Sequence, residues 1–243
     1  MRKYELALET EQEFNGIKFY RIRALRSFSD VSKGELGGYI QQESNLSQES
    51  DCWVYGDARV YGNAIVFGNA IVFGNARVFD RAQVYGNAQV FDEAQVFGGA
   101  QVSGDAQVYG NARVYGYARV FDNARVSGYA RVSGDARVYG YARVFDNARV
   151  SGYAYVCGDA IVSGDAQISK FYQVKSVVNL KWSFTSLPKG VQVGCKFHSM
   201  KEWQEKHLEI GQANGLSPEM SKEYFKLMKA IRRIQRLEAK ESK

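Results

Sequence analysis

Seven arginines in consecutive six-residue repeats are the residues of this sequence whose chemistry and spacing best suit anion binding. Each stands in the middle of an Ala-Arg-Val triplet. A guanidinium group stays charged and offers a planar fork of donors that matches carboxylate or phosphate oxygens. These side chains are predicted to recognise an acidic surface or a phosphorylated small molecule: Arg113, Arg119, Arg125, Arg131, Arg137, Arg143 and Arg149.

Aromatic residues accompany the arginines, because the position after Val is Tyr or Phe in most repeats. Rings stack in ladders between coils, and exposed rings also stack on a base or an aromatic partner. The arginines have the same two possible roles, ladder packing and recognition. Asp122, Asp135 and Asp146 are expected to reduce the repulsion between stacked guanidinium groups. The rings expected to neighbour the arginines are Tyr109, Tyr115, Tyr117, Phe121, Tyr129 and Tyr139.

The formal net charge of +6 lies in the C-terminal part of the chain. Residues 38–169 carry 10 basic and 13 acidic side chains, whereas residues 170–243 carry 15 and 7. A uniform phosphate-binding track along the repeat is therefore not predicted, and nucleic acid is not an expected partner. No segment approaches the roughly 20 apolar residues of a membrane span, so no membrane partner is expected.

The arginines belong to a six-residue repeat that predicts the elements positioning them. Alanine occupies every sixth position from Ala58 to Ala166, and Val or Ile stands two residues later from Val60 to Ile168. Side chains alternate along a strand, so Ala and Val point inward and the residue between them points outward. Gly, Asn and Asp tolerate φ > 0 at a sharp corner. Each repeat thus predicts one short strand and one corner.

This pattern resembles the hexapeptide repeat of left-handed parallel β-helices. The resemblance implies three hexads per turn and an all-β solenoid over residues 38–169, with Ala and Val filling its interior. Under that geometry the arginines fall on three faces: Arg113, Arg131 and Arg149 on one, Arg119 and Arg137 on another, and Arg125 and Arg143 on the remaining one.

The known enzymes of that fold need residues that the repeat lacks. The resemblance to acyltransferases would imply a histidine general base between the subunits of a trimer, and carbonic anhydrases of similar fold hold zinc with three histidines. The chain has only His198 and His207, both beyond the repeat. Cys52, Cys157 and Cys195 show no CxxC spacing, which argues against a structural zinc site or a disulfide framework. We expect no enzymatic activity, no metal and no cofactor.

The chain before the regular repeat predicts a cap, because an open solenoid end exposes unpaired strand edges. Two strands, over residues 4–8 and 17–25, with Asn15-Gly16 as a turn, predict a small β cap at residues 1–37. Less regular hexads then extend the solenoid. Their inward small positions are expected to hold Ile40, Leu46 and Cys52.

The chain after the repeat predicts a second cap and two helices. Strands over residues 180–187 and 191–197 predict a β-hairpin within residues 170–198. Ser199 and Glu202 form a capping box for a helix that ends near Asn214-Gly215, and a second helix begins at Ser217-Pro218, so residues 199–243 form a helical module.

An apolar stripe marks the second helix, with spacings that alternate between four and three residues. It either packs against its own β-helix or associates with copies of the chain. The stripe consists of Met220, Tyr224, Leu227, Ile231 and Ile234.

Two further segments carry a resemblance to a family. Residues 34–40, followed by 43–48 and 52–55, resemble the leader of hexapeptide-repeat proteins encoded by bacteriophages and prophages, and residues 193–196 with the Trp203 helix resemble their C-terminal module. The scattered cysteines and the lack of an apolar run predict a cytoplasmic protein, and the resemblance implies that the cell is an infected or lysogenic bacterium.

The favoured hypothesis is a non-catalytic binding protein that inhibits or sequesters a component of host defence, through its arginines and rings or through its end modules. Its expected partner is a host bacterial protein or a phosphorylated small molecule. A homo-oligomer is also expected, and analogy with relatives of the fold indicates a trimer. The alternatives are an acyltransferase-like enzyme and an architectural, self-assembling protein.

Overall fold

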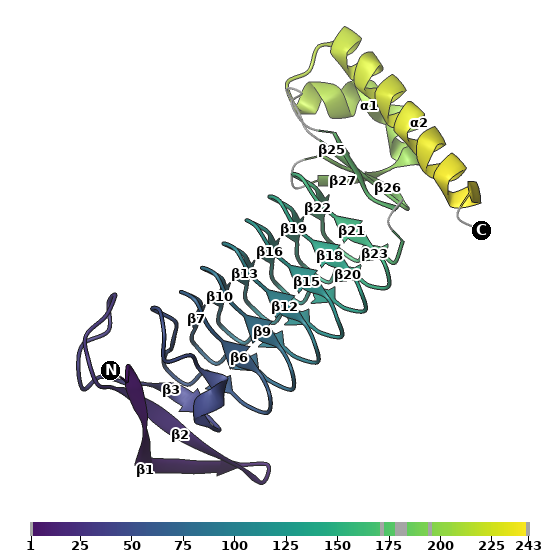
Figure 1. Ribbon diagram of the computed structural model, residues 1–243. Helices are drawn as coiled ribbons and strands as arrows, with labels where there is room; N and C mark the ends of the chain where they lie inside the picture. The colour runs from purple at the N-terminus through teal and green to yellow at the C-terminus, as the bar shows by residue number, and fades with distance from the viewer. Residues whose placement is uncertain (1, 171–172, 178–183, 194–195, 242–243) are drawn as a thin grey trace.

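The repeat folds into a parallel β-solenoid (Figure 1). The computed structural model describes residues 2–170, 173–177, 184–193 and 196–241. Within the regular repeat, strands pair in parallel with the strand that lies three hexads further along the chain, as Arg113 does with Arg131 and Arg131 with Arg149. Three hexads therefore make one turn, and the predicted all-β solenoid is confirmed.

The solenoid has three faces, each a parallel sheet of short strands. The first face contains β3 (Leu36–Ile40), β5 (Arg59–Val60), β8 (Arg77–Val78), β11 (Gln95–Val96), β14 (Arg113–Val114), β17 (Arg131–Val132), β20 (Arg149–Val150) and β23 (Gln167–Ile168). The second face contains β4 (Trp53–Val54), β7 (Ile71–Val72), β10 (Gln89–Val90), β13 (Gln107–Val108), β16 (Arg125–Val126), β19 (Arg143–Val144) and β22 (Ile161–Val162). The third face contains β6 (Ile65–Val66), β9 (Gln83–Val84), β12 (Gln101–Val102), β15 (Arg119–Val120), β18 (Arg137–Val138) and β21 (Tyr155–Val156).

Inward Ala and Val side chains fill the solenoid, and those from Ala58 to Val162 have no exposed surface. Each Val removed from water contributes roughly 1.5–3 kcal/mol of hydrophobic free energy. Backbone hydrogen bonds join successive coils: Arg113 N donates to Ala130 O at 2.9 Å, and Tyr115 N donates to Val132 O at 2.9 Å. Core and backbone thus leave only the outward side chains free to vary.

Corners of the solenoid require left-handed backbone. Most corners use Gly at this position, but Asp80, Asp92, Asp122 and Asp146 take φ between 56° and 60°. Corners also stack closely, since a Cβ on Gly104 would lie 2.8 Å from the backbone nitrogen of Asp122. The small residues of the repeat are therefore required both by φ and by the space between coils.

The first coil differs from its predicted register. Val54 pairs with Val72, three hexads further on, whereas the partners of Ile40 and Leu46 are Val60 and Val66, each beyond the three-hexad spacing. The first coil is therefore enlarged between Leu46 and Val54. The prediction that Ile40 and Leu46 occupy the small position was wrong: both take the aliphatic position, which accommodates their larger side chains.

A hairpin of β1 (Tyr4–Phe14) and β2 (Ile17–Ala24) covers the N-terminal end. Its turn residues Asn15 and Gly16 both have positive φ, as the predicted turn requires. Strand β2 pairs antiparallel with β3, so the hairpin continues the first face of the solenoid. Tyr4 and Phe28 make edge contacts with Trp53, with ring centroids 6.1 and 5.3 Å apart, and thereby close the apolar bore.

Buried Lys3 ties this cap to the enlarged first coil. Its Nζ donates to the carbonyl of Cys52 at 2.9 Å and to the Cys52 Sγ at 3.2 Å. The carbonyls of Glu49 and Ser50 accept from the same group at 3.3 Å. Burial lowers the pKa of Lys3 and raises the pKa of the Cys52 thiol. The ammonium group thus satisfies carbonyls that the end of the solenoid leaves without a strand partner.

At the C-terminal end, β24 (Lys175–Val177), β25 (Phe184–Leu187), β26 (Gly190–Val193) and β27 (Lys196–Ser199) form an antiparallel sheet. The predicted strand over 191–197 is instead two strands, since β26 and β27 pair with each other. Residues 180–183 of the other predicted strand lie outside the described residues. The sheet joins the last coils through Ile161 N, which donates to Thr185 Oγ1 at 2.9 Å, and through Ser163 Oγ, which donates to Gln192 Oε1 at 3.1 Å.

Two helices complete the C-terminal module, α1 (Met200–Ala213) and α2 (Pro218–Glu241). The predicted capping box is present, because Ser199 N donates to Glu202 Oε2 at 2.7 Å and Glu202 N donates to Ser199 Oγ at 3.2 Å. Among the described residues, no helix combines the length and hydrophobicity needed to cross a bilayer.

The three-hexad coil predicts which deletions the fold accepts. Deletion of residues 116–133 removes one whole turn and should leave a shorter folded protein, because every inward position keeps its partner. Deletion of residues 116–118 should unfold the upper coils, because it moves Ala and Val out of the core. Circular dichroism melting of both variants checks this. Similar melting temperatures for the two deletions would refute the register.

Candidate binding surface

The seven arginines form a belt around the solenoid, from Arg113 to Arg149. Each is the outward residue of its strand, and all seven are exposed. Parallel register stacks Arg113, Arg131 and Arg149 on the first face. Arg125 and Arg143 stack on the second face, and Arg119 and Arg137 stack on the third. The predicted distribution over three faces is therefore confirmed.

The belt is not neutralised within the part of the chain that the structure describes. None of its arginines forms an ion pair there, and the one aromatic contact places the Arg137 guanidinium 5.3 Å from the Tyr155 ring centroid. Two of the three carboxylates expected to soften the repulsion, Asp122 and Asp146, accept hydrogen bonds from backbone amides instead. Asp122 Oδ2 accepts from Gly140 N at 3.2 Å, and Asp146 Oδ2 accepts from Gly164 N at 3.0 Å.

Glutamine fills the same outward position in the coils below the belt. Gln89 and Gln107 lie in register, and Gln107 Nε2 donates to Gln89 Oε1 at 3.2 Å. Like charges stacked directly opposite one another destabilise a sheet, whereas an amide ladder does not. The change from Gln to Arg therefore gives the fold no evident gain in stability, and it places charged groups in solvent.

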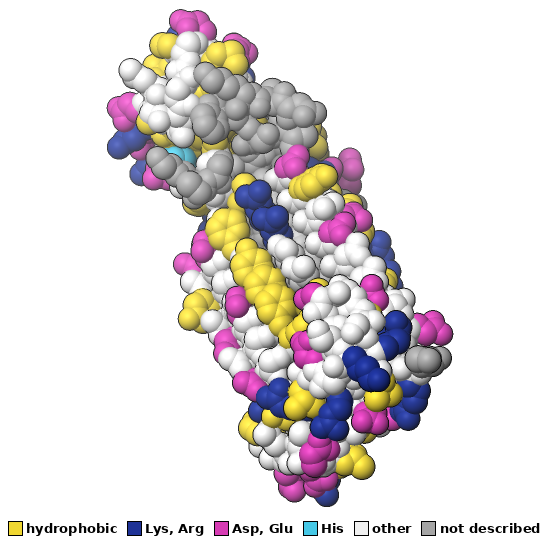
Figure 2. Space-filling view, turned by 90° about the vertical axis from the view of Figure 1, so that its left-hand side faces the viewer, with side chains coloured by type: hydrophobic (Ala, Val, Ile, Leu, Met, Phe, Trp, Pro, Cys, Tyr) yellow, Lys and Arg dark blue, Asp and Glu magenta, His cyan; other side chains and the backbone are white. Residues whose placement is uncertain are grey.

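Stacked rings flank the lower part of the belt. Tyr109 stacks on Phe91 with centroids 4.9 Å apart, and Tyr115 stacks on Phe97 at 5.0 Å. Phe121 stacks on Tyr139 at 4.9 Å. Figure 2 shows such a row of hydrophobic side chains along one side of the solenoid. These four predicted ring residues are half-buried and have a packing role; their outer edges remain accessible.

The remaining predicted rings, Tyr117 and Tyr129, stand at corners and are 67% and 65% exposed. Two more corner tyrosines, Tyr141 and Tyr153, are equally exposed and were missed by the sequence analysis. The signal was present, since all four follow the corner glycine in every second hexad. Each corner of the solenoid thus carries at least one exposed phenol beside the belt.

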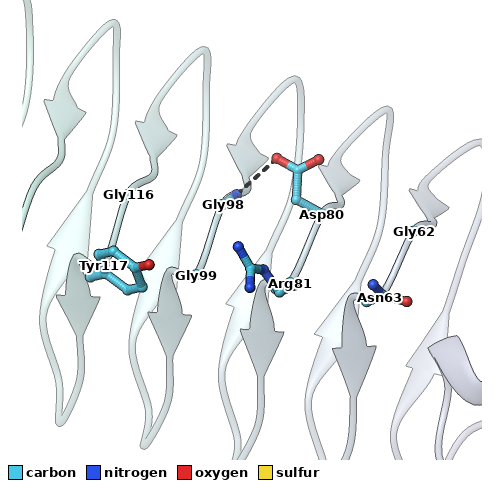
Figure 3. Close-up of a pocket in the computed structure, with 8 residues that line it drawn as sticks. All are labelled: Gly62, Asn63, Asp80, Arg81, Gly98, Gly99, Gly116 and Tyr117. Atoms are coloured by element: carbon cyan, nitrogen blue, oxygen red, sulfur yellow. Dashed lines mark hydrogen bonds between the residues drawn. The ribbon is translucent and has the colours of Figure 1, made fainter.

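A corner groove of about 490 Å³ lies below the belt (Figure 3). Its centre is Gly99, where a Cβ would lie 3.0 Å from the Tyr117 ring. Tyr117 extends over this glycine, and Arg81 stands on the other side of it. The Asp80 carboxylate accepts from Gly98 N at 3.1 Å, so it is held by backbone. The groove offers one cation and one ring edge, and Arg81 lies two coils below Tyr117.

The histidines have packing partners. His198 in β27 meets the edge of Trp203 at 5.7 Å between ring centroids, and His207 in α1 stacks on Phe225 at 4.9 Å. Among the described residues, no group of three or more His, Cys, Asp or Glu side chains is placed to hold a metal ion.

The apolar stripe of α2 divides between two surroundings. Tyr224 is 4% exposed and lies near Phe184, with ring centroids 6.4 Å apart, and Ile231 is half-buried against the same cluster. Met220, Leu227 and Ile234 are exposed, and Leu237 continues their line. Two of the five predicted oligomerisation residues therefore pack within their own chain, and three remain available.

Comparisons with known proteins agree with the architecture. The model of the YdcK beta solenoid repeat matches residues 54–68, 58–72, 106–120, 118–131, 130–144 and 142–158. A search of curated proteins found no match to the chain. The fold and these matches define a repeat β-solenoid protein, and four of the six matched segments overlap the belt.

The stacked arginines predict a stability effect. Replacing Arg131 by Gln should leave the melting temperature unchanged or raise it, because the substitution removes repulsion from Arg113 and Arg149, worth roughly 0.2–1 kcal/mol per pair. The gain should shrink in high salt, where exposed charges are screened. Thermal unfolding at two ionic strengths checks this. A marked loss of stability would show that the belt serves the fold.

Proposed function

We propose that this protein is a non-catalytic binding protein that captures a phosphorylated small molecule or an acidic protein surface on its arginine belt. The observation that supports this is the run of seven exposed arginines in register, without an ion pair among the described residues. Arg pairs of this kind hold phosphate or carboxylate oxygens in bidentate hydrogen bonds.

The biological setting of the proposal comes from the resemblance to phage-encoded hexapeptide-repeat proteins. A small binding protein made by a bacteriophage fits a role against host defence. There it would inhibit a defence protein or sequester a phosphorylated signal in the bacterial cytoplasm. The acyltransferase-like alternative would need its catalytic base in the end modules, at His198 or His207. Both imidazoles already contact aromatic rings, which gives that alternative less support.

The belt is tested with tripolyphosphate and with a glutamate-rich peptide as probes. The variant Arg131→Gln, Arg137→Gln, Arg143→Gln should bind the preferred probe roughly tenfold more weakly than the parent, because exposed charged contacts contribute about 0.2–1 kcal/mol each. Calorimetry over a series of salt concentrations measures the loss and its screening.

A matched control removes the same net charge far from the belt. The variant Lys222→Gln, Lys226→Gln, Lys240→Gln should bind within about twofold of the parent, because these lysines lie exposed on α2. Equal weakening in both triple variants would show non-specific attraction, and unchanged binding in the belt variant would contradict the proposal.

Self-assembly is a second candidate function, supported by the exposed side chains of α2. Met220, Leu227 and Ile234 recur every seven residues, as in the seam of a coiled coil. A homo-oligomer built through this seam, a trimer by analogy with relatives of the fold, is compatible with the belt because the two lie on different parts of the molecule.

The seam predicts separable effects of two substitutions. Leu227→Asp with Ile234→Asp should dissociate the assembly and leave the module folded, because both side chains are exposed. Met228→Asp should instead unfold the module, since Met228 is fully buried. Light scattering and circular dichroism distinguish the outcomes. A parent mass near 27.3 kDa at micromolar concentration counts against self-assembly.

A further inference from the structure

The ring ladder of the second face is interrupted once inside the belt. Phe73, Phe91 and Tyr109 stack with centroids 4.7 and 4.9 Å apart and planes within 5°. The next coil has Ser127 at the ring position, and the coil after it has Phe145. Backbone register is unbroken, because Ser127 N donates to Val144 O at 2.9 Å and Phe145 N donates to Val162 O at 3.0 Å. We call Tyr109, Ser127 and Phe145 the open rung.

The open rung has the width of one aromatic ring. Strand spacing of about 4.8 Å sets the distance between rungs, so the ring positions of Tyr109 and Phe145 are roughly 10 Å apart. A ring placed midway would lie about 4.8 Å from each neighbour. That spacing equals the 4.7–5.0 Å between centroids in the uninterrupted ladders. A planar group can therefore complete the ladder without any movement of the coil.

Two belt arginines adjoin the open rung. Arg125 and Ser127 alternate to the same side of one strand, roughly 7 Å apart along it, and Arg143 bears the same relation to Phe145. Both arginines are exposed and lie in parallel register. Figure 2 shows basic side chains beside the upper end of a row of hydrophobic ones. The face thus offers a ring site with an anion site at its side.

We propose that the open rung binds a nucleotide. Its base stacks between Tyr109 and Phe145, and its phosphate is held by Arg125 and Arg143. The ribose spans the distance between the ring position and the arginines, and the Ser127 hydroxyl faces the edge of the base. Stacking tolerates every base, so base preference should be weak. The inference rests on the proposed function, because it assigns a chemical class to the anion that the belt captures.

The other interruptions lack this combination. On the third face, Ser103 lies between Tyr85 and Phe121, but the outward residues on its own rung and the rung above are Gln101 and Arg119, one arginine in place of two. On the first face, Ser133 and Ser151 follow Tyr115 in successive coils, so a bound ring would have a ring on one side alone. The Ser103 rung therefore provides a matched control with rings and less charge.

Filling the open rung with a protein side chain tests the proposal. Calorimetry on the full chain uses AMP, GMP, CMP and UMP, with tripolyphosphate and O-phosphotyrosine for comparison. Ser127→Tyr should weaken nucleotide binding at least tenfold and raise the melting temperature by about 2–4 °C, because the new ring completes the ladder. Ser127→Ala should retain binding. Ser103→Tyr should give the same gain in melting temperature and leave nucleotide binding unchanged.

The outcomes separate the open rung from the belt. If nucleotide binding survives in Ser127→Tyr but is lost in the double variant Arg125→Gln, Arg143→Gln, the open rung is not the base site, and the arginine belt alone binds the phosphate. A lowered melting temperature in Ser127→Tyr also overturns it, because the rings would then not be aligned. If O-phosphotyrosine binds more tightly than all four nucleotides, the assignment of a nucleotide as the ligand is wrong. Absence of nucleotide binding overturns the inference, whereas tripolyphosphate binding that is insensitive to the belt arginines overturns the proposed function itself.

Discussion

The backbone hydrogen bonds between coils are the interaction on which the rest of this structure depends. The strands of the regular repeat are too short to be stable alone, and the strands one turn before and one turn after supply the missing bonds. The bonds form only if every corner turns at the same place, which requires left-handed backbone at Gly or Asp. Asp, like Asn, tolerates φ > 0, so four corners have Asp in place of Gly. The carboxylate of each accepts a hydrogen bond from a backbone amide of the next coil.

That constraint separates the interior from the surface. Ala and Val are held at their positions by the width of the bore, whereas the outward residues of the belt are exposed and pair in register with their equivalents in neighbouring coils. Surface chemistry can therefore change along the solenoid at little cost to the fold, as it does where Gln gives way to Arg. Because equivalent positions repeat about every 4.8 Å, a single small residue among rings creates a space of defined width.

The two ends follow different physics from the repeat. At the N-terminus, Lys3 and the β1–β2 hairpin satisfy carbonyls and strand edges that a further coil would otherwise satisfy. At the C-terminus, a four-stranded antiparallel sheet meets the last coils through Thr185 and Gln192. Most of the excess positive charge lies before the helices, because residues 170–199 carry five lysines and no acidic side chain. The exposed seam of α2 lies outside both the bore and the belt, so the proposed assembly and the proposed recognition would use different surfaces.

The period of the sequence by itself determined the short strands, their corners and the inward position of Ala and Val, because side chains alternate along a strand. The resemblance to hexapeptide-repeat β-helices implied the three-hexad turn and the three-face distribution of the arginines. The sequence also determined the capping box of α1, which is a local contact between Ser199 and Glu202. Only the tertiary structure decided the register of Ile40 and Leu46, the division of the last predicted strand into β26 and β27, and the burial of Tyr224 beside exposed Leu227. These depend on which surfaces meet across long distances in the chain, and no local pattern encodes them. The tertiary structure also decided the partners of the Asp122 and Asp146 carboxylates. Both accept hydrogen bonds from backbone amides of the next coil, and the position of that coil cannot be known from a local pattern.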